Sequence, residues 1–353
     1  MAAAYVVTTR TRASSAALVA AVVIVATLAA APAFASRGMI EDLFYILTML
    51  TLSHFWNLLA GYGGLVSEGQ QAFVGIGAYA LYGSVILGGV DPVASILIGG
   101  VAALILAVPT AFFAFRLQGA YFAIGTWVIA EVVRLSVAQW RAVGGGTGTS
   151  LPRDALGDMM FVGWIEATFD VRAAAARDIL AYWLALALAV ATVAGIYRLL
   201  RSKPGLALAA IRDNTEAARS VGVDAGRMKW FVFLTSAFGT GLAGGLIYLQ
   251  RARISPDAAF SLTDWTAYVI FIVVIGGLGT IEGPIIGVLV FFILQSLFAD
   301  YGSWYLMILG LIGIAVMLFA PRGLWGLFSE KTGLHLFPIR RRLVGGSLSE
   351  RES

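Results

Sequence analysis

The sequence predicts an all-α, polytopic membrane helical bundle of about ten transmembrane segments with both termini in the cytoplasm. Three observations predict it. Hydrophobic residues make up 59% of the 353 residues and charged residues only 12%, about half the charged fraction of an ordinary soluble protein. The apolar runs are long and continuous, without the short apolar/polar alternation of a barrel strand. Lys and Arg gather in a central loop and in the C-terminal tail, which are therefore expected on the cytoplasmic side.

Ten apolar runs are candidate membrane spans, for which roughly 20 residues are needed to cross a bilayer. The first, residues 16–31, follows Arg10 and Arg12 and ends in an Ala-x-Ala motif. It is either a secretory signal or a first membrane helix, and we favour a retained helix within residues 1–38. The run 265–277 is short for a span. The other eight spans are expected at about 39–60, 71–89, 93–115, 120–140, 179–200, 230–249, 284–298 and 304–319.

The charged connections orient these spans, because short loops rich in Lys and Arg stay in the cytoplasm. The first bundle half, 39–200, contains a long loop, 141–177, whose four Arg are balanced by four acidic residues. This loop is expected outside the cell. A net-basic cytoplasmic loop, 201–229, precedes the second bundle half, 230–320, and a basic cytoplasmic tail follows at 321–353.

The loop between the two halves is the longest polar, net-basic run. Pro204 suits a first helical turn, Gly222 suits a helix stop, and Asp224 can cap the next helix. The helix-like segment between them is either a solvated connector or a docking helix that carries force from a soluble partner. One apolar stripe is expected on it, formed by Leu206, Ala210, Ile211, Ala217, Ala218 and Val221.

No catalytic constellation, metal site or cofactor is predicted. The only histidines are His54 and His335, and cysteine is absent, so a histidine-based metal site, a catalytic triad or a thiolate site is not expected. The Gly-rich run 144–150 lacks the lysine of a phosphate-binding loop, so ATP must be handled by another chain. No basic patch with interleaved aromatic residues indicates nucleic-acid binding.

Two Gly-rich segments, 61–79 and 276–287, interrupt the membrane pattern. Broken helices occur at membrane depth where they are buried in protein or line a cavity, and corresponding breaks in two halves of a transporter often mark its pathway. The polar residues Ser67, Gln70 and Gln71 of the first segment either line such a pathway or bridge helices, and we favour the pathway.

Individual glycines are instead expected to let helices approach closely. The spacing favours this for Gly241-x-x-x-Gly245 and for Gly283-x-x-x-Gly287.

Glu131 and Arg134 are three residues apart on one span, so they share a helix face and can pair. A charge near the bilayer centre costs roughly 2.5–3.5 kcal/mol on insertion scales, so both side chains are expected to face the bundle interior. A structural pair and a functional pair both remain open. Glu68 and Glu282 are expected near the membrane surface, in solvent.

Residues 57–79 read NLLAGYGGLVSEGQQAFVGIGAY, and residues 118–135 read QGAYFAIGTWVIAEVVRL. They resemble the first signature and the next segment of branched-chain amino acid ABC transporter permeases of the LivM-like family. Residues 205–246 are similar to its cytoplasmic coupling loop and following helix, and 254–287, with VVIGGLGTIEGPIIG, resemble its C-terminal signature. The likeness runs from about residue 57 to residue 325 in the expected order.

The resemblance implies a multi-pass permease subunit of an ATP-driven importer in the bacterial inner membrane, which is not itself an enzyme. Its implied partners are a homologous LivH-like permease, two ABC ATPase subunits, a periplasmic substrate-binding protein and membrane lipid. Residues expected to couple to the ATPase are Arg212, Asp213, Glu216, Ala217, Ala218 and Gly222. Residues expected along the substrate pathway are Ser67, Gln70, Gln71, Thr126 and Glu131.

The implied substrate is a branched-chain or related amino acid, or a small amide. Glu68 and Gln71 stand where the family is expected to have apolar or small residues, which leaves the choice of substrate open. The alternative is a self-contained secondary transporter or channel for a small polar solute. That alternative needs an intramembrane ion site, for which Glu131 is the strongest carboxylate.

Overall fold

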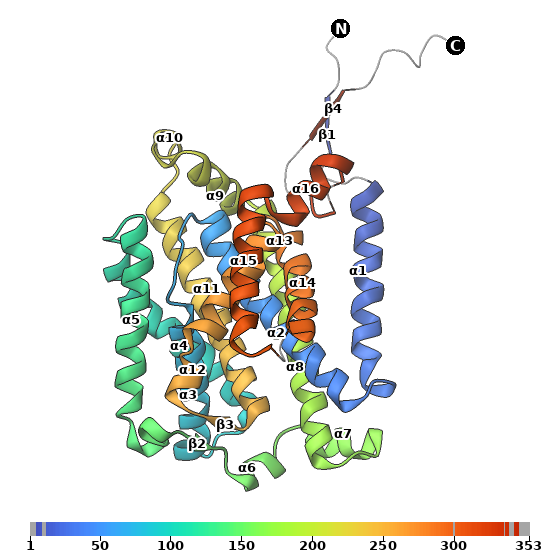
Figure 1. Cartoon of the computed structure of the whole chain (residues 1–353), viewed down its shortest axis with the longest axis vertical. Coiled ribbons are helices and arrows are strands. Elements are labelled where there is room, and N and C mark those ends of the chain that lie inside the picture. Colours follow the sequence, from blue (N-terminus) through green and yellow to red (C-terminus); the bar gives the residue numbers. More distant parts are fainter. Residues whose placement is uncertain (1–4, 9–11, 299–300, 335, 339–341, 346–353) are drawn as a thin grey trace.

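The computed structural model describes residues 5–8, 12–298, 301–334, 336–338 and 342–345 and shows a bundle of helices (Figure 1). Within these residues nine helices are long and apolar enough to cross a membrane. Helix α14 is a shorter apolar helix of 17 residues. The predicted all-α membrane bundle is confirmed.

Most membrane helices lie close to the expected limits. They are α1 (Arg12–Ala30), α2 (Arg37–Asn57), α3 (Gln70–Gly88), α4 (Pro92–Ala114), α5 (Ala120–Ala138), α8 (Ala173–Arg201), α11 (Ala225–Arg251), α13 (Tyr268–Gly276), α14 (Glu282–Phe298) and α15 (Ser303–Phe319). The connecting helices are η1 (Ala31–Ala33), η2 (Leu58–Tyr62), η3 (Arg141–Val143), η4 (Gly145–Thr147), α6 (Arg153–Gly157), α7 (Val162–Phe169), α9 (Lys203–Asp213), α10 (Thr215–Ser220), α12 (Pro256–Ala259), η5 (Thr263–Ala267) and α16 (Gly323–Thr332).

Short strand pairs lie at opposite ends of the bundle (Figure 1). Strand β1 (Tyr5–Thr8) pairs antiparallel with β4 (Arg342–Gly345) at the end that carries α9, α10 and α16. Strand β2 (Thr149–Ser150) pairs with β3 (Arg253–Ile254) at the end that carries α6 and α7. The central loop and the long loop 141–177 therefore lie at opposite ends of the bundle. His335 is outside the described residues.

The run predicted to be short for a span is longer than the sequence suggests. Helix α12, the π-helical turn η5 and α13 together form a segment of 21 residues, Pro256–Gly276. Ser255 caps α12 by accepting a hydrogen bond from the Ala258 amide. The sequence underestimates the length of this segment, because polar residues at its start interrupt the apolar run.

The expected single docking helix is two helices, α9 and α10. Asn214 separates them, since its Oδ1 accepts hydrogen bonds from the amides of Glu216 and Ala217, both at 3.0 Å. An asparagine side chain offers the backbone this alternative to helical pairing and so begins a new helix. Of the expected apolar stripe, Ile211 and Ala218 are buried, whereas Leu206, Ala217 and Val221 are exposed.

The core is densest where α3, α4 and α11 cross, and glycine makes this crossing possible. A Cβ on Gly77 would collide with the backbone of Gly241, and one on Gly99 would collide with the backbone of Gly77. Gly283 and Gly287 lie equally close to the backbone of α13 and the residues after it, while Gly245 has ordinary packing distances. The predicted role of glycine in close approach is confirmed for Gly241, Gly283 and Gly287.

Gly241→Val is expected to destabilise the protein by about 2 kcal/mol or more, because overpacking a tight interior forces backbone shifts. Thermal unfolding of the purified protein in detergent measures the effect. Gly195→Val is the matched control, since Gly195 also lies in a membrane helix but has nothing within 4 Å of the position of a Cβ. A Gly241→Val protein as stable as this control would contradict the proposed packing.

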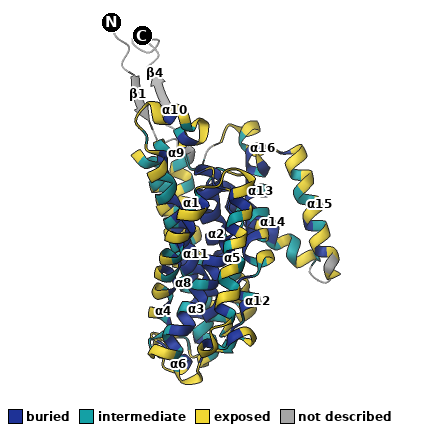
Figure 2. Ribbon diagram, turned by 90° about the vertical axis from the view of Figure 1, so that its left-hand side faces the viewer, coloured by how far each residue is buried: buried dark blue, intermediate teal, exposed yellow. Residues whose placement is uncertain are grey.

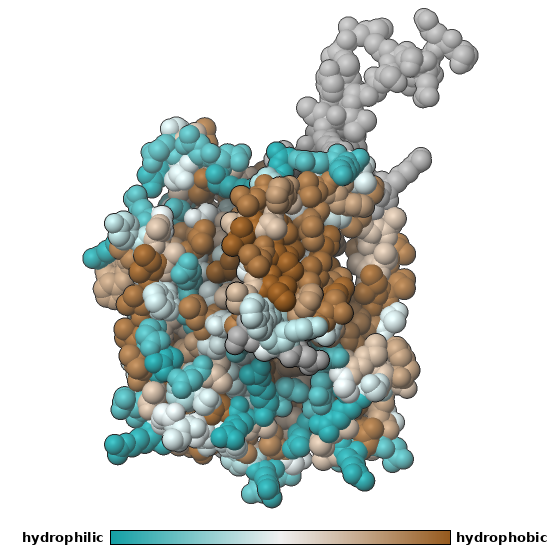
Figure 3. Space-filling model, in the orientation of Figure 1, coloured by the Kyte–Doolittle hydropathy of each residue, from teal (hydrophilic) through white to brown (hydrophobic). Residues whose placement is uncertain are grey.

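Burial differs sharply between helices (Figure 2). The membrane segments that contain α2 and α11 are each 78% buried, whereas the segment of α1 is 6% buried. Helix α1 is held at its end, where Tyr182 Oη donates to the Leu28 carbonyl at 2.6 Å and Trp183 Nε1 donates to the Ala29 carbonyl at 3.0 Å. Hydrophobic surface covers α14 and α15 in Figure 3, as expected for helices that meet lipid.

Candidate functional site

The segment between α2 and α3 turns back into the bundle. Trp56 Nε1 of α2 donates to the Ser67 carbonyl at 2.8 Å, and the Glu68 amide donates to Thr126 Oγ1 of α5 at 3.1 Å. Thr126 is six residues beyond the start of α5, about 9 Å along the helix. Residues 63–69 therefore re-enter the bundle, and α3 begins at membrane depth.

A buried polar cluster surrounds the start of α3. Thr240 Oγ1 of α11 donates to Gln70 Oε1 at 3.3 Å, and Thr266 Oγ1 of η5 donates to Gln71 Oε1 at 2.5 Å. The four side chains are 1–3% exposed. Gln70 Nε2 is buried and has no hydrogen-bond partner among the described residues. A buried amide donor without a partner is unusual in a folded protein, so this cluster has the capacity to donate to a further group.

The break between α13 and α14, residues 277–281, lies against the end of α2. Asn57 Oδ1 accepts from the Gly279 amide and Asn57 Nδ2 donates to the Thr280 carbonyl, both at 2.8 Å. His54 Nε2 lies 3.2 Å from the Ile281 carbonyl. These side chains satisfy backbone groups that the break leaves unpaired, as a broken membrane helix requires.

Sequence reasoning missed the role of Asn57 and treated His54 only as evidence against a metal site. The available signal was an asparagine and a histidine three residues apart in an apolar run, since buried polar side chains need partners.

We call the exposed residues of α9, of α10 and of the turn that follows α10 the docking surface, after the role predicted for them from the sequence. Arg212, Asp213, Glu216, Ala217 and Gly222 are exposed at this end of the bundle, whereas Ala218 is 2% exposed and packs inward. Arg219 pairs with Glu216 at 3.0 Å. The guanidinium of Arg212 lies against Gly279, where a Cβ would collide with it. The docking surface therefore touches the break between α13 and α14.

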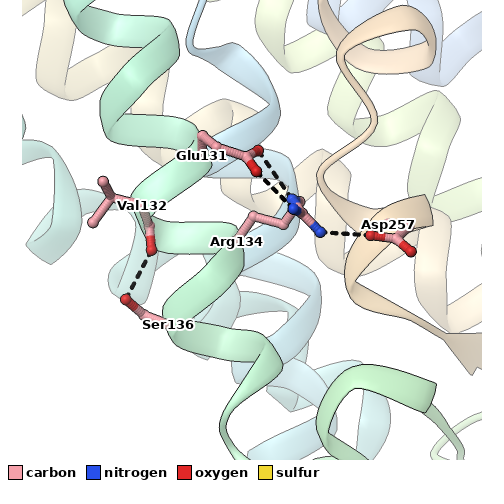
Figure 4. Close-up of polar contacts among 5 residues, drawn as sticks. All are labelled: Glu131, Val132, Arg134, Ser136 and Asp257. Atoms are coloured by element: carbon pink, nitrogen blue, oxygen red, sulfur yellow. Dashed lines mark hydrogen bonds and ion pairs between the residues drawn. The ribbon is translucent and has the colours of Figure 1, made fainter.

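Glu131 and Arg134 form the predicted pair on the side of α5 that faces α12 (Figure 4), and neither side chain is buried in the bundle interior. Arg134 binds Glu131 through two hydrogen bonds of 2.9 and 2.6 Å and donates from Nη1 to Asp257 of α12 at 2.6 Å. The Glu131 side chain is 46% exposed and that of Asp257 is 83% exposed. Helix α5 lies at the edge of the bundle, where α12 contacts Arg134 but leaves Glu131 about half-exposed.

The two other acidic residues also differ from expectation. Glu282 is 7% exposed and accepts a hydrogen bond from the Phe337 amide at 2.9 Å. Glu68 is half-buried in the re-entrant segment beside α5. Neither lies in open solvent, because the breaks place both residues against other elements.

The structure brings together four of the five residues expected along the pathway. Ser67 lies in the re-entrant segment, Gln70 and Gln71 directly follow it, and Thr126 contacts it from α5. Glu131 is outside this group, since it pairs with Arg134 at the bundle surface. Within the described residues no group of three or more histidine or acidic side chains could hold a metal ion.

Comparison with known proteins identifies the family. The model of the family described as the permease component of branched-chain amino acid transport systems matches residues 39–320. The chain belongs to this family. It is a permease component of a transport system and not an enzyme. The match covers the re-entrant segment 63–69, the break at 277–281, the polar cluster and the docking surface.

Individual relatives agree with this assignment. The permease is 29% identical over 311 residues to the high-affinity branched-chain amino acid transport system permease protein LivM of Salmonella typhimurium, covering 84% of this chain and 72% of the relative. LivM of Escherichia coli K12 matches at the same identity and coverage. A probable LivH permease of Methanocaldococcus jannaschii is 30% identical over 148 residues, covering 39% and 45% of the two chains. No solved structure matches the chain.

Proposed function

We propose that this permease is the transmembrane subunit of an ATP-driven ABC importer that moves branched-chain or related amino acids, or small amides, into the cytoplasm. One observation carries the proposal: an exposed docking surface contacts the break at 277–281, which is bonded to the buried end of α2. The relatives named as branched-chain amino acid permeases support the substrate class.

The Lys and Arg residues of the loops determine the proposed orientation of the permease in the membrane. The end with α9, α10 and both described chain ends faces the cytoplasm of a bacterial inner membrane, and loop 141–177 faces the periplasm. The bundle halves are 39–200 and 230–320, the coupling loop is 201–229, and the basic tail is 321–353. Residues 1–38 contribute a peripheral membrane helix.

The proposed coupling path begins at the ATPase. One of the two ATPase subunits docks on α9 and α10, and closure of the ATPase pair displaces Arg212. Arg212 moves the break at Gly279, which is bonded to Asn57. Trp56, the neighbour of Asn57 on α2, holds the re-entrant segment through Ser67. Movement at the docking surface thus reaches the polar cluster and alternates its access to the two sides of the membrane.

The polar cluster is the proposed part of the pathway inside this chain. Ser67, Gln70, Gln71 and Thr126 lie where a helix begins at membrane depth, and helix starts there favour contact with anionic groups such as a substrate carboxylate. The amide of Gln70 has a donor to offer. Glu131 belongs to the outer wall of the pathway, and the substrate arrives from a periplasmic binding protein.

Gln70→Ala is expected to change the uptake rate or the substrate range by about fivefold, because one hydrogen bond is worth about 1 kcal/mol. Uptake of labelled leucine and of related amino acids measures the change. Gln139→Ala is the control, since Gln139 is exposed. Wild-type kinetics with every substrate tested would return Gln70 to a packing role.

Co-purification tests the proposed function most directly. The chain is tagged at its C-terminus and extracted from native membranes in mild detergent, and mass spectrometry identifies the bound proteins. A LivH-like permease and two ATPase subunits are expected. The complex is then placed in lipid vesicles, where leucine uptake should require ATP and the binding protein.

Two results would overturn the proposal. One is recovery of the chain alone. The other is uptake that survives without ATP and collapses with the proton gradient, which would favour a self-contained secondary transporter.

A further inference from the structure

One side of the bundle carries charged side chains within a membrane span, where contact with lipid is energetically costly. The charged seam consists of Glu131, Arg134 and Asp257 (Figure 4). Helix α5 has 19 residues and is therefore about 28 Å long. Glu131 lies about 10 Å, and Arg134 about 6 Å, from the end of α5 that leads into loop 141–177. Glu131 is therefore well inside the span.

The pairing within the seam does not neutralise it. Two carboxylates and one guanidinium leave a net charge of −1, since Arg134 pairs with both Glu131 and Asp257. Asp257 uses one oxygen in this pairing and is 83% exposed. Charged residues within membrane spans almost always face a protein interior or a water-filled cavity. In the described part of the chain Arg134 packs against α12, but Glu131 stays 46% and Asp257 83% exposed, because α5 lies at the edge of the bundle.

The outward apolar residues of α5 run beside the seam. Ile124, Val128, Val132 and Leu135 follow the i, i+4, i+8, i+11 spacing of one helix stripe and are all exposed. In Figure 2, α5 lies on the side of the bundle that is turned towards the viewer and carries exposed residues. An apolar patch with polar, solvent-accessible residues at its rim is typical of a protein–protein interface.

Helices α1 and α15 provide the contrast within the same chain. Both are exposed along most of their length, and neither has a charged residue between Ala13 and Ala30 or between Ser303 and Phe319. Figure 3 shows hydrophobic surface over α15 and hydrophilic surface towards α12. The composition of α1 and α15 suits lipid, while that of the α5–α12 face does not.

We infer that the α5–α12 face is covered by the second, homologous permease subunit, and that the charged seam lines the aqueous translocation path between the two subunits. The inference rests on the proposed function, which supplies that partner. The apolar stripe of α5 contacts the partner directly. The seam stays in water, so its net charge is solvated throughout transport.

Single cysteines test the inference, and the chain has none of its own. Val128→Cys and Leu135→Cys, each carrying a photoreactive benzophenone maleimide, are expected to capture the second permease in native membranes. Leu311→Cys on α15 is the matched control, because Leu311 is also exposed and apolar. Capture of the second permease from Leu311→Cys but not from the two α5 positions would overturn the inference.

Water access is measured separately. Trp127 is one turn before Glu131 on the same helix face and is 44% exposed. Trp127→Cys is expected to react with a charged, membrane-impermeant methanethiosulfonate about tenfold faster than Leu311→Cys, because lipid excludes that reagent. Equal rates at the two positions would overturn the inference.

ATP-dependent leucine uptake in the same preparations separates this inference from the proposed function. Normal uptake without capture at α5 would overturn the proposed interface but would still support the proposed importer function. A complex that lacks a second permease would overturn both.

Discussion

Asn57→Leu is expected to destabilise the permease by about 2 kcal/mol or more, because it leaves two part-buried backbone groups unpaired, and an unpaired group costs about 1–3 kcal/mol when buried. Leucine is close to asparagine in size but can neither accept from the Gly279 amide nor donate to the Thr280 carbonyl. The expected result is a lower yield of membrane-inserted protein and a lower unfolding temperature in detergent.

Asn214→Leu is the matched control for this variant. Asn214 also binds two backbone groups, the amides of Glu216 and Ala217, but it is exposed. Water can replace those hydrogen bonds, so the loss of the cap should cost only about 1 kcal/mol. Equal losses in the two variants, or a wild-type unfolding temperature for Asn57→Leu, would show that Asn57 does not hold the break.

Arg212→Glu is expected to reduce ATP-driven uptake by about tenfold or more while ATP hydrolysis continues, since a coupling contact of 1.4 kcal/mol corresponds to about tenfold. The exposed guanidinium lies against Gly279, and reversal of its charge alters both the docking surface and its link to the break. Uptake and ATP hydrolysis are measured on the same vesicles. Arg153→Glu, at the opposite end of the bundle, is the control.

Ala217→Asp tests the same surface without altering Arg212. Ala217 is exposed in the first turn of α10, where a carboxylate favours the helix, so the variant should fold and lose coupling. Ala218→Asp should instead fail to fold, because Ala218 is 2% exposed. Wild-type coupling in both Arg212→Glu and Ala217→Asp would remove the docking surface from the mechanism.

Much of the candidate site could be predicted from local sequence signals. Ser67, Gln70 and Gln71 are polar residues in an apolar, Gly-rich context, and Glu131 and Arg134 have the spacing of a helical pair. Their partners could not be predicted. Thr240 and Thr266 are ordinary residues of other spans and become significant only through their contacts with the two glutamines. The outward position of Glu131 also escaped prediction, because helix spacing does not specify which face is covered.

The sequence by itself determined that the chain spans the membrane as helices and that its basic loops lie together at one end. These properties depend on hydropathy and charge summed over neighbouring residues, which are local quantities. Only the tertiary structure decided which broken segments meet. Asn57 and Thr280 are 223 residues apart in the chain, and their hydrogen bond exists because the packing of α2 against the break brings two unpaired backbone groups to one buried amide.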